Sequence, residues 1–113
     1  MKHILTGEYG EQLALKYLKK KKYKIIAHNY TSKLGELDII AKDQQYIVIV
    51  EVKTRSTGAF GCGFEAVTPA KQQKIKQVTQ LFLMQHNLVD QDIRFDVISV
   101  DGEKIEHFIN AFE

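Results

Sequence analysis

The stretch Tyr46-Ile47-Val48-Ile49-Val50-Glu51-Val52-Lys53-Thr54-Arg55 decides the fold of this chain. Its first half is aliphatic at every position, which is typical of a strand that is covered on both faces in the middle of a sheet. Side chains two residues apart on a strand share a face, so Glu51, Lys53 and Arg55 project to one side. The sequence therefore predicts a central strand that carries charged groups on one face toward its end.

Helical and strand patterns surround this strand in the order α-β-β-β-α-β-β. The expected elements are a helix from about Gly7 to Lys21 with Thr6 as N-cap, strands at Lys24–Tyr30, Glu36–Lys42 and Tyr46–Arg55, a helix that opens at Thr68-Pro69 and ends near His86, and strands at Ile93–Val100 and Lys104–Ile109 joined by Asp101-Gly102. A threonine suits the N-cap and a proline suits the first helical position. This order predicts an α/β fold in which helices flank a mixed central sheet.

The composition predicts one globular domain over residues 1–113. Hydrophobic residues make up 44% and charged residues 27% of the chain, which excludes a disordered tail or a fibrous repeat. No apolar run approaches the roughly 20 residues of a membrane helix, and the N-terminus lacks the apolar core of a signal peptide. With Cys62 as its single cysteine, the chain forms no internal disulfide. We therefore expect a cytoplasmic protein without a membrane partner.

The net charge of +2 conceals an uneven distribution. Residues 1–24 carry seven lysines and two glutamates, whereas residues 90–113 carry two basic and seven acidic residues. A basic face of this kind suits nucleic acid, and the lysine-rich run at 19–24 would add to it. Two solvated faces explain the same pattern, so charge alone leaves both interpretations open.

Charged side chains inside strand patterns mark the candidate site, because burying a charge is costly. Asp38 lies in the middle of the apolar strand Glu36–Lys42, and Glu51 and Lys53 interrupt the central strand. If these strands pair as a hairpin, Asp38 lies beside Glu51. Carboxylate oxygens suit Mg²⁺ or Mn²⁺, and a lysine beside them can orient water or neutralise charge on a phosphate. An ion pair of Lys53 with either carboxylate is the structural alternative.

Other residues extend this hypothesis. Glu11 borders the apolar arc of the first helix and can face the two strand carboxylates, although alone it is more typical of a surface position. Arg55, Lys71 and Lys74 are candidate contacts for DNA phosphates, with a solvated helix face as the alternative. The loop Gly58–Gly63, which contains Cys62, is interpreted as a connector or a flap.

Several sequence pieces together resemble the YraN family, small bacterial proteins related to archaeal Holliday junction resolvases in the restriction-endonuclease-like, or PD-(D/E)XK, superfamily. The resemblance covers nearly the full chain. Its pieces, in order, are Gly7-Glu8-Tyr9-Gly10-Glu11 with Ala14 and Tyr17-Leu18, Asn29-Tyr30, Gly35-Glu36-Leu37-Asp38-Ile39-Ile40-Ala41, Val50-Glu51-Val52-Lys53-Thr54-Arg55, Val67 with Lys71, and Arg94-Phe95-Asp96-Val97.

The resemblance implies an α-β-β-β-α-β core, to which the last strand pattern adds one more strand. It also implies that Asp38, Glu51 and the Val52 carbonyl bind Mg²⁺ or Mn²⁺, with Lys53 as the catalytic lysine and Glu11 as a further catalytic carboxylate. We therefore expect a metal-dependent endonuclease that acts on DNA, with branched or flapped DNA as a candidate substrate and a homodimer as the expected assembly. The alternatives are a nucleic-acid-binding module with a nuclease fold that does not cut, and a structural subunit whose acidic cluster is an ion-pair network.

Overall fold

The computed structural model describes residues 6–55 and 67–113, and it leaves out the side chains of residues 6–8 and 55. The elements follow the predicted order: α1 (Thr6–Lys20), β1 (Lys24–Ser32), β2 (Gly35–Asp43), β3 (Tyr46–Arg55), α2 (Pro69–Gln85), β4 (Asp92–Asp101) and β5 (Lys104–Phe112). The loop Gly58–Gly63 lies outside the described residues. Of the helices in the described ranges, none is long and apolar enough to cross a membrane.

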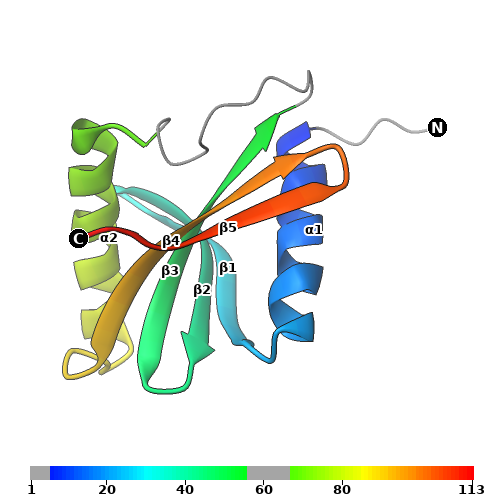
Figure 1. Cartoon of the computed structure of the whole chain (residues 1–113). Helices are drawn as coiled ribbons and strands as arrows, with labels where there is room; N and C mark the ends of the chain where they lie inside the picture. The colour runs from blue at the N-terminus through cyan, green and yellow to red at the C-terminus, as the bar shows by residue number, and fades with distance from the viewer. Residues whose placement is uncertain (1–5, 56–66) are drawn as a thin grey trace.

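The five strands form one mixed sheet in the order β1-β2-β3-β4-β5. Only the β3–β4 pair is parallel, and α2 makes the crossover between these two strands. The neighbouring strands of the pairs β1–β2, β2–β3 and β4–β5 are antiparallel. Figure 1 shows the sheet between the two helices. The predicted α/β fold, the β2–β3 hairpin and the additional last strand are confirmed.

Strand β3 separates two apolar clusters, as its sequence predicts. Ile47 and Ile49 pack beneath α2, on a side called here the α2 face. Val48 and Val50 pack beneath α1, on the α1 face. All four residues are at most 1% exposed, because helices cover both faces of the central strand.

Most element ends lie within one residue of their predicted positions, but β1 continues two residues beyond Tyr30 and β5 three residues beyond Ile109. The Thr68 hydroxyl accepts a hydrogen bond from the Lys71 backbone N–H (3.2 Å), and Pro69 begins α2. At the last hairpin the prediction is wrong by one residue, because Asp101 pairs with Lys104. The connecting residues are therefore Gly102 and Glu103, and the glycine takes the left-handed φ of 64° that the turn requires.

A buried carboxylate, Asp96, organises the junction of β4 and β5 on the α1 face. Arg94 donates to both of its oxygens (3.0 and 2.9 Å), and the Asn110 backbone N–H donates to one of them (3.0 Å). His107 Nε2 lies 2.7 Å from the other, while the Tyr17 hydroxyl lies 3.0 Å from His107 Nδ1. The register of the β4–β5 pair shifts at this point, and Asn110 has a φ of 55°. Asp96 therefore stabilises a bulge that no sequence pattern indicates.

Replacing Gly10 by alanine should destabilise the protein, although alanine is the better helix former by about 1 kcal/mol. A Cβ at this position would lie 1.9 Å from Thr54 Oγ1 and 3.0 Å from Thr54 Cβ. We expect Gly10→Ala to lower the free energy of unfolding by about 1–3 kcal/mol in chemical denaturation, and Thr54→Ala to recover part of this loss in the double variant. A Gly10→Ala variant as stable as wild type would show that α1 does not approach β3 this closely.

Replacing Asp96 by asparagine should weaken the protein mainly above acidic pH. Burial alone would raise the pKa of this carboxyl, but the hydrogen bonds from His107, Arg94 and the Asn110 backbone together lower it below its ordinary value. A lowered folded-state pKa contributes stability that is present above the unfolded pKa of about 3.9 and is lost as the pH falls below it. Denaturation between pH 2 and pH 7 should show this acid-dependent loss in wild type and a smaller one in Asp96→Asn. Parallel curves for the two proteins would contradict the expectation.

Candidate functional site

Both helices begin at the end of the molecule where β3 ends, as Figure 1 shows. This arrangement brings together residues that are distant in the sequence. Glu11 comes from the first turns of α1, Asp38 from β2, Glu51 and Lys53 from β3, and Lys71 from the first turn of α2. We call these five residues the acid–lysine cluster.

Asp38 occupies a point where β2 twists away from β3. Leu37 packs on the α2 face and Ile39 on the α1 face, although residues two apart on a regular strand would share a face. On the neighbouring strand Asn29, between the residues that pair with Leu37 and Ile39, has a left-handed φ of 54°. The twist directs the Asp38 carboxylate toward β3, where its Oδ2 accepts the Val52 backbone N–H at 2.9 Å.

Glu51 is almost fully buried beside Asp38. Its residue is 4% exposed, and it follows Val50, whose partner across the β2–β3 hairpin is Ile39. Burial and, after it, the negative charge of Asp38 raise the pKa of Glu51 to about 8, against the smaller opposing effects of Lys71, the Asp38 backbone N–H and Lys53. Its Oε2 atom is buried and has no hydrogen-bond partner among the described residues.

Glu11 approaches the same place from the α1 face. Burial and the negative charge of Asp38 raise the pKa of Glu11, which places the two carboxylates within electrostatic range. Glu11 Oε2 lies 3.5 Å from Nδ1 of His28 on β1 and, like Glu51 Oε2, is buried without a hydrogen bond. Thr54 Oγ1, the atom that Gly10 approaches, is unpartnered in the same way. The buried side-chain oxygens without a hydrogen bond in the described part of the chain therefore all belong to α1 and β3 near the acid–lysine cluster.

The two lysines of the cluster lie close to each other. Burial lowers the pKa of Lys53, and the neighbouring Lys71 ammonium lowers it further. Across residues 6–55 and 67–113, one ion pair closer than 4.0 Å involves the cluster, that of Glu11 with His28, and none joins Lys53 to Asp38 or Glu51. This geometry disfavours an ion pair of Lys53 with either carboxylate.

The three residues expected to contact DNA have different positions. Lys71 belongs to the cluster itself. Lys74, one turn later on α2, lies with its aliphatic stem over Gly35 at the start of β2, 3.5 Å from where a Cβ would stand. The Arg55 side chain lies outside the described part of the structure, so its proposed contact stays a prediction.

The sequence did not indicate a role for His28 or for the group formed by Asp96, Arg94 and His107. His28 carries no motif and pairs with Ile39 as an ordinary strand residue, so only its distance to Glu11 identifies it. The Asp96–Arg94–His107 group was visible only as a fragment of the resemblance, because its members meet through the β4–β5 bulge. Asp96 has no unpartnered oxygen, which indicates a structural role for this second group.

The donor chemistry of the acid–lysine cluster fits a hard divalent cation. Asp38 and Glu51 supply carboxylate oxygens, and Glu51 has a buried oxygen without a donor. Within the described residues no three His, Cys, Asp or Glu side chains converge as a preformed cage. Mg²⁺ does not need such a cage, since it commonly binds one or two carboxylates and keeps several waters.

The raised pKa of Glu51 predicts that the metal-free protein loses stability as the pH rises. Between the unfolded pKa of about 4.3 and the folded value of about 8, the folded state holds a proton that the unfolded state has released. The free energy of unfolding should therefore fall in this range, by at most about 1.4 kcal/mol per pH unit, and Glu51→Gln should remove the fall. Denaturation in EDTA from pH 5 to pH 9 tests this, with Glu106→Gln on β5 as an exposed control. A Glu51→Gln curve parallel to that of wild type would contradict it.

Comparison with known proteins agrees with the resemblance found in the sequence at the level of the family. A family model described as "Uncharacterised protein family UPF0102" matches residues 10–100, which include the whole acid–lysine cluster. A UPF0102 protein of Alkaliphilus oremlandii is 50% identical over 112 residues, covering 94% of this chain and 96% of its own. The corresponding protein of Thermodesulfovibrio yellowstonii is 45% identical over 99% of both chains, and that of Geobacter sulfurreducens is 42% identical over 96% of this chain and 89% of its own. The chain belongs to the UPF0102 family.

Proposed function

We propose that this protein is a metal-dependent endonuclease that hydrolyses phosphodiester bonds of DNA. The observation that carries the proposal is the set of buried oxygens on Glu51, Thr54 and Glu11 that have no hydrogen bond among the described residues, the last of them 3.5 Å from His28 Nδ1. Buried polar atoms in folded proteins are nearly always hydrogen-bonded, so a local exception calls for a ligand or a catalytic role. Asp38, Lys53 and Lys71 act electrostatically on Glu51 and give the site the mixed charge that a cation and a phosphate together require.

Each residue has a distinct part in this proposal. Asp38, Glu51 and the Val52 carbonyl would hold Mg²⁺ or Mn²⁺, which when bound polarises the phosphoryl oxygen and lowers the pKa of a coordinated water. The Val52 N–H orients Asp38. Lys53 would orient the attacking water and neutralise charge that develops on the phosphate. Glu11 would add negative charge on the α1 side.

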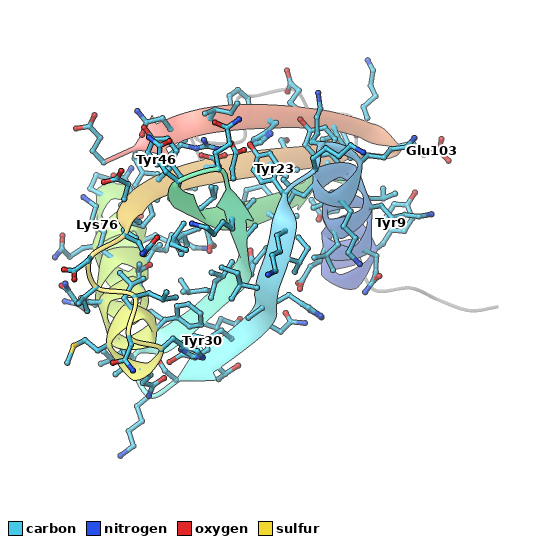
Figure 2. The ribbon with its side chains drawn as sticks, turned by 90° about the horizontal axis from the view of Figure 1, so that it is seen from below. Tyr9, Tyr23, Tyr30, Tyr46, Lys76 and Glu103 are labelled. Carbon is cyan, nitrogen blue, oxygen red and sulfur yellow. The ribbon has the colours of Figure 1, made fainter. Side chains whose placement is uncertain are left out.

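The surface around the cluster suits a polyanion. Lys74 and Arg55 are proposed phosphate contacts beside the active residues. The exposed lysines at 19–22 and 24 lie at and after the last turn of α1, at the other end of that helix from Glu11. The acidic β4–β5 turn adjoins the end of β3, since Asp101 pairs with Arg55, and Figure 2 shows Glu103 at the opposite side of the molecule from α2. The proposed DNA-binding face is therefore the α2 side of this end of the sheet. Branched or flapped DNA and a homodimer remain parts of the proposal.

The test is cleavage of linear, flapped and four-way DNA by wild type, Asp38→Asn and Lys53→Ala, each with Mg²⁺, Mn²⁺ or EDTA. Wild type should cut with either metal and not in EDTA. Each variant should be slower by at least about 100-fold, the usual contribution of one catalytic group. Lys76→Ala is the matched lysine control, because Figure 2 shows Lys76 on the outer side of α2; it should cut like wild type.

Three results would overturn the mechanism: cutting in EDTA, equal cutting by the two active-site variants, or no cutting of any substrate. Tight DNA binding by wild type without cutting would favour the alternative of a nuclease fold that binds nucleic acid. Mn²⁺ binding gives a readout apart from activity. Mn²⁺ should raise the melting temperature of wild type and not that of Asp38→Asn.

A further inference from the structure

Lys71 is an exposed residue, and its position extends the buried stripe of α2 by one turn toward the helix start. Ile75, Val78 and Phe82 are at most 2% exposed and form the side of the helix that packs on the sheet. Lys71 stands four residues before Ile75 and seven before Val78, so it occupies the same stripe one turn closer to the helix start. Lys76 does not belong to this stripe.

The row of β3 side chains that faces α2 changes from apolar to polar at the level of Lys71. Ile47 and Ile49 pack beneath α2, and Glu51 and Lys53 are the next residues on this face. Because α2 begins at the end where β3 finishes (Figure 1), the apolar parts of the two rows meet each other. Lys71 then comes opposite Glu51 and Lys53.

The packing around the first turn of α2 limits where the Lys71 stem can run. Val67, just before the helix, is buried in the same apolar cluster as Ile49, and the Gln72 side-chain amide donates to its carbonyl at 3.0 Å. In the second and third turns, α2 approaches Gly35 so closely that a Cβ there would lie 3.5 Å from Lys74 Cγ and 3.3 Å from Val78 Cγ2. The helix is thus held against the start of β2 and shares an apolar cluster with β3.

Two neighbouring ammonium groups repel each other unless an anion lies between them. In the described structure no carboxylate lies within 4.0 Å of the Lys53 or Lys71 ammonium group. The position between them is therefore suited to an anion that the protein does not itself supply.

We propose that Lys53 and Lys71 form a two-lysine cradle for the scissile phosphate, so that Lys71 is a catalytic residue that contacts a non-bridging phosphate oxygen. This inference rests on the proposed nuclease function. It separates Lys71 from Lys74 and Arg55, which would contact phosphates beside the one that is cut. The cradle would stabilise the negative charge that grows on the phosphate oxygens as water attacks phosphorus and the leaving oxygen departs.

The first experiment separates catalysis from DNA binding. Single-turnover cleavage with Mg²⁺ and DNA binding in EDTA are measured for wild type, Lys71→Ala, Lys71→Arg and the control Lys76→Ala. Lys71→Ala should lower the cleavage rate at saturating DNA by about 100-fold and change the DNA Kd by less than about threefold. Lys71→Arg should restore at least about tenfold of that rate, because arginine keeps the charge.

The second experiment needs neither metal nor activity. Inorganic phosphate is titrated into the protein in EDTA, and amide NMR shifts are followed. Saturable shifts at Glu51–Lys53 and in the first turn of α2 should occur in wild type and Lys76→Ala and be lost in Lys71→Ala. The spectrum of each variant without phosphate reports whether it is folded.

The outcomes distinguish the two proposals. If wild type cuts DNA and Lys71→Ala cuts as fast, or if Lys71→Ala only weakens DNA binding, the cradle is wrong and the nuclease proposal stands. If wild type does not cut DNA at all, the nuclease proposal fails, and the phosphate titration alone decides whether the cradle exists. Equal phosphate shifts in Lys71→Ala and wild type would also overturn the cradle.

Discussion

The burial of strand β3 on both faces is the constraint on which the rest of the structure depends. Ile47 and Ile49 on one face and Val48 and Val50 on the other are removed from water, each burial being worth about 1.5–3 kcal/mol. A strand of this kind needs a helix layer on either side and a paired strand at each edge. Because side chains alternate between the two faces of a strand, the face of each polar residue after Val50 is fixed by its position in the sequence. Glu51 therefore enters the space beneath α2, where water is scarce.

The molecule contains two buried acidic sites with opposite chemistry. Asp96 accepts hydrogen bonds from Arg94 and from the Asn110 backbone and lies within hydrogen-bond distance of His107, and the net effect lowers its pKa. Glu51 has a buried oxygen to which none of the described residues donates, and its pKa is raised. A carboxylate with its hydrogen bonds satisfied stabilises the native register, whereas an unsatisfied one costs stability and is available to a ligand. The contrast between these sites distinguishes a structural group from a candidate catalytic one.

Much of the fold and part of the site could be predicted from the sequence, for reasons that are local. Strict alternation in β3 predicts that Glu51 and Lys53 share the α2 face, and the short connection between the second and third strands predicts the hairpin that brings Asp38 to Glu51. The cap at Thr68 and Pro69 follows from their chemistry. The twist at Asp38 and the bulge at Asp96 could not be predicted in this way. Both depend on backbone conformations at Asn29 and Asn110 that the surrounding packing selects.

By itself, the sequence determined the order of the elements, the central position of β3, the family membership and the kinds of donor atom at the candidate site. Periodicity and capping encode these features within a few residues of each position. Only the tertiary structure decided which donors meet. Glu11 and Lys71 reach the strand carboxylates because two helices pack on opposite faces of one sheet and begin at the same end. Asp38 faces β3 because β2 twists there. The distance between residues 60 positions apart depends on helix packing and sheet twist, and no local pattern in the chain records it.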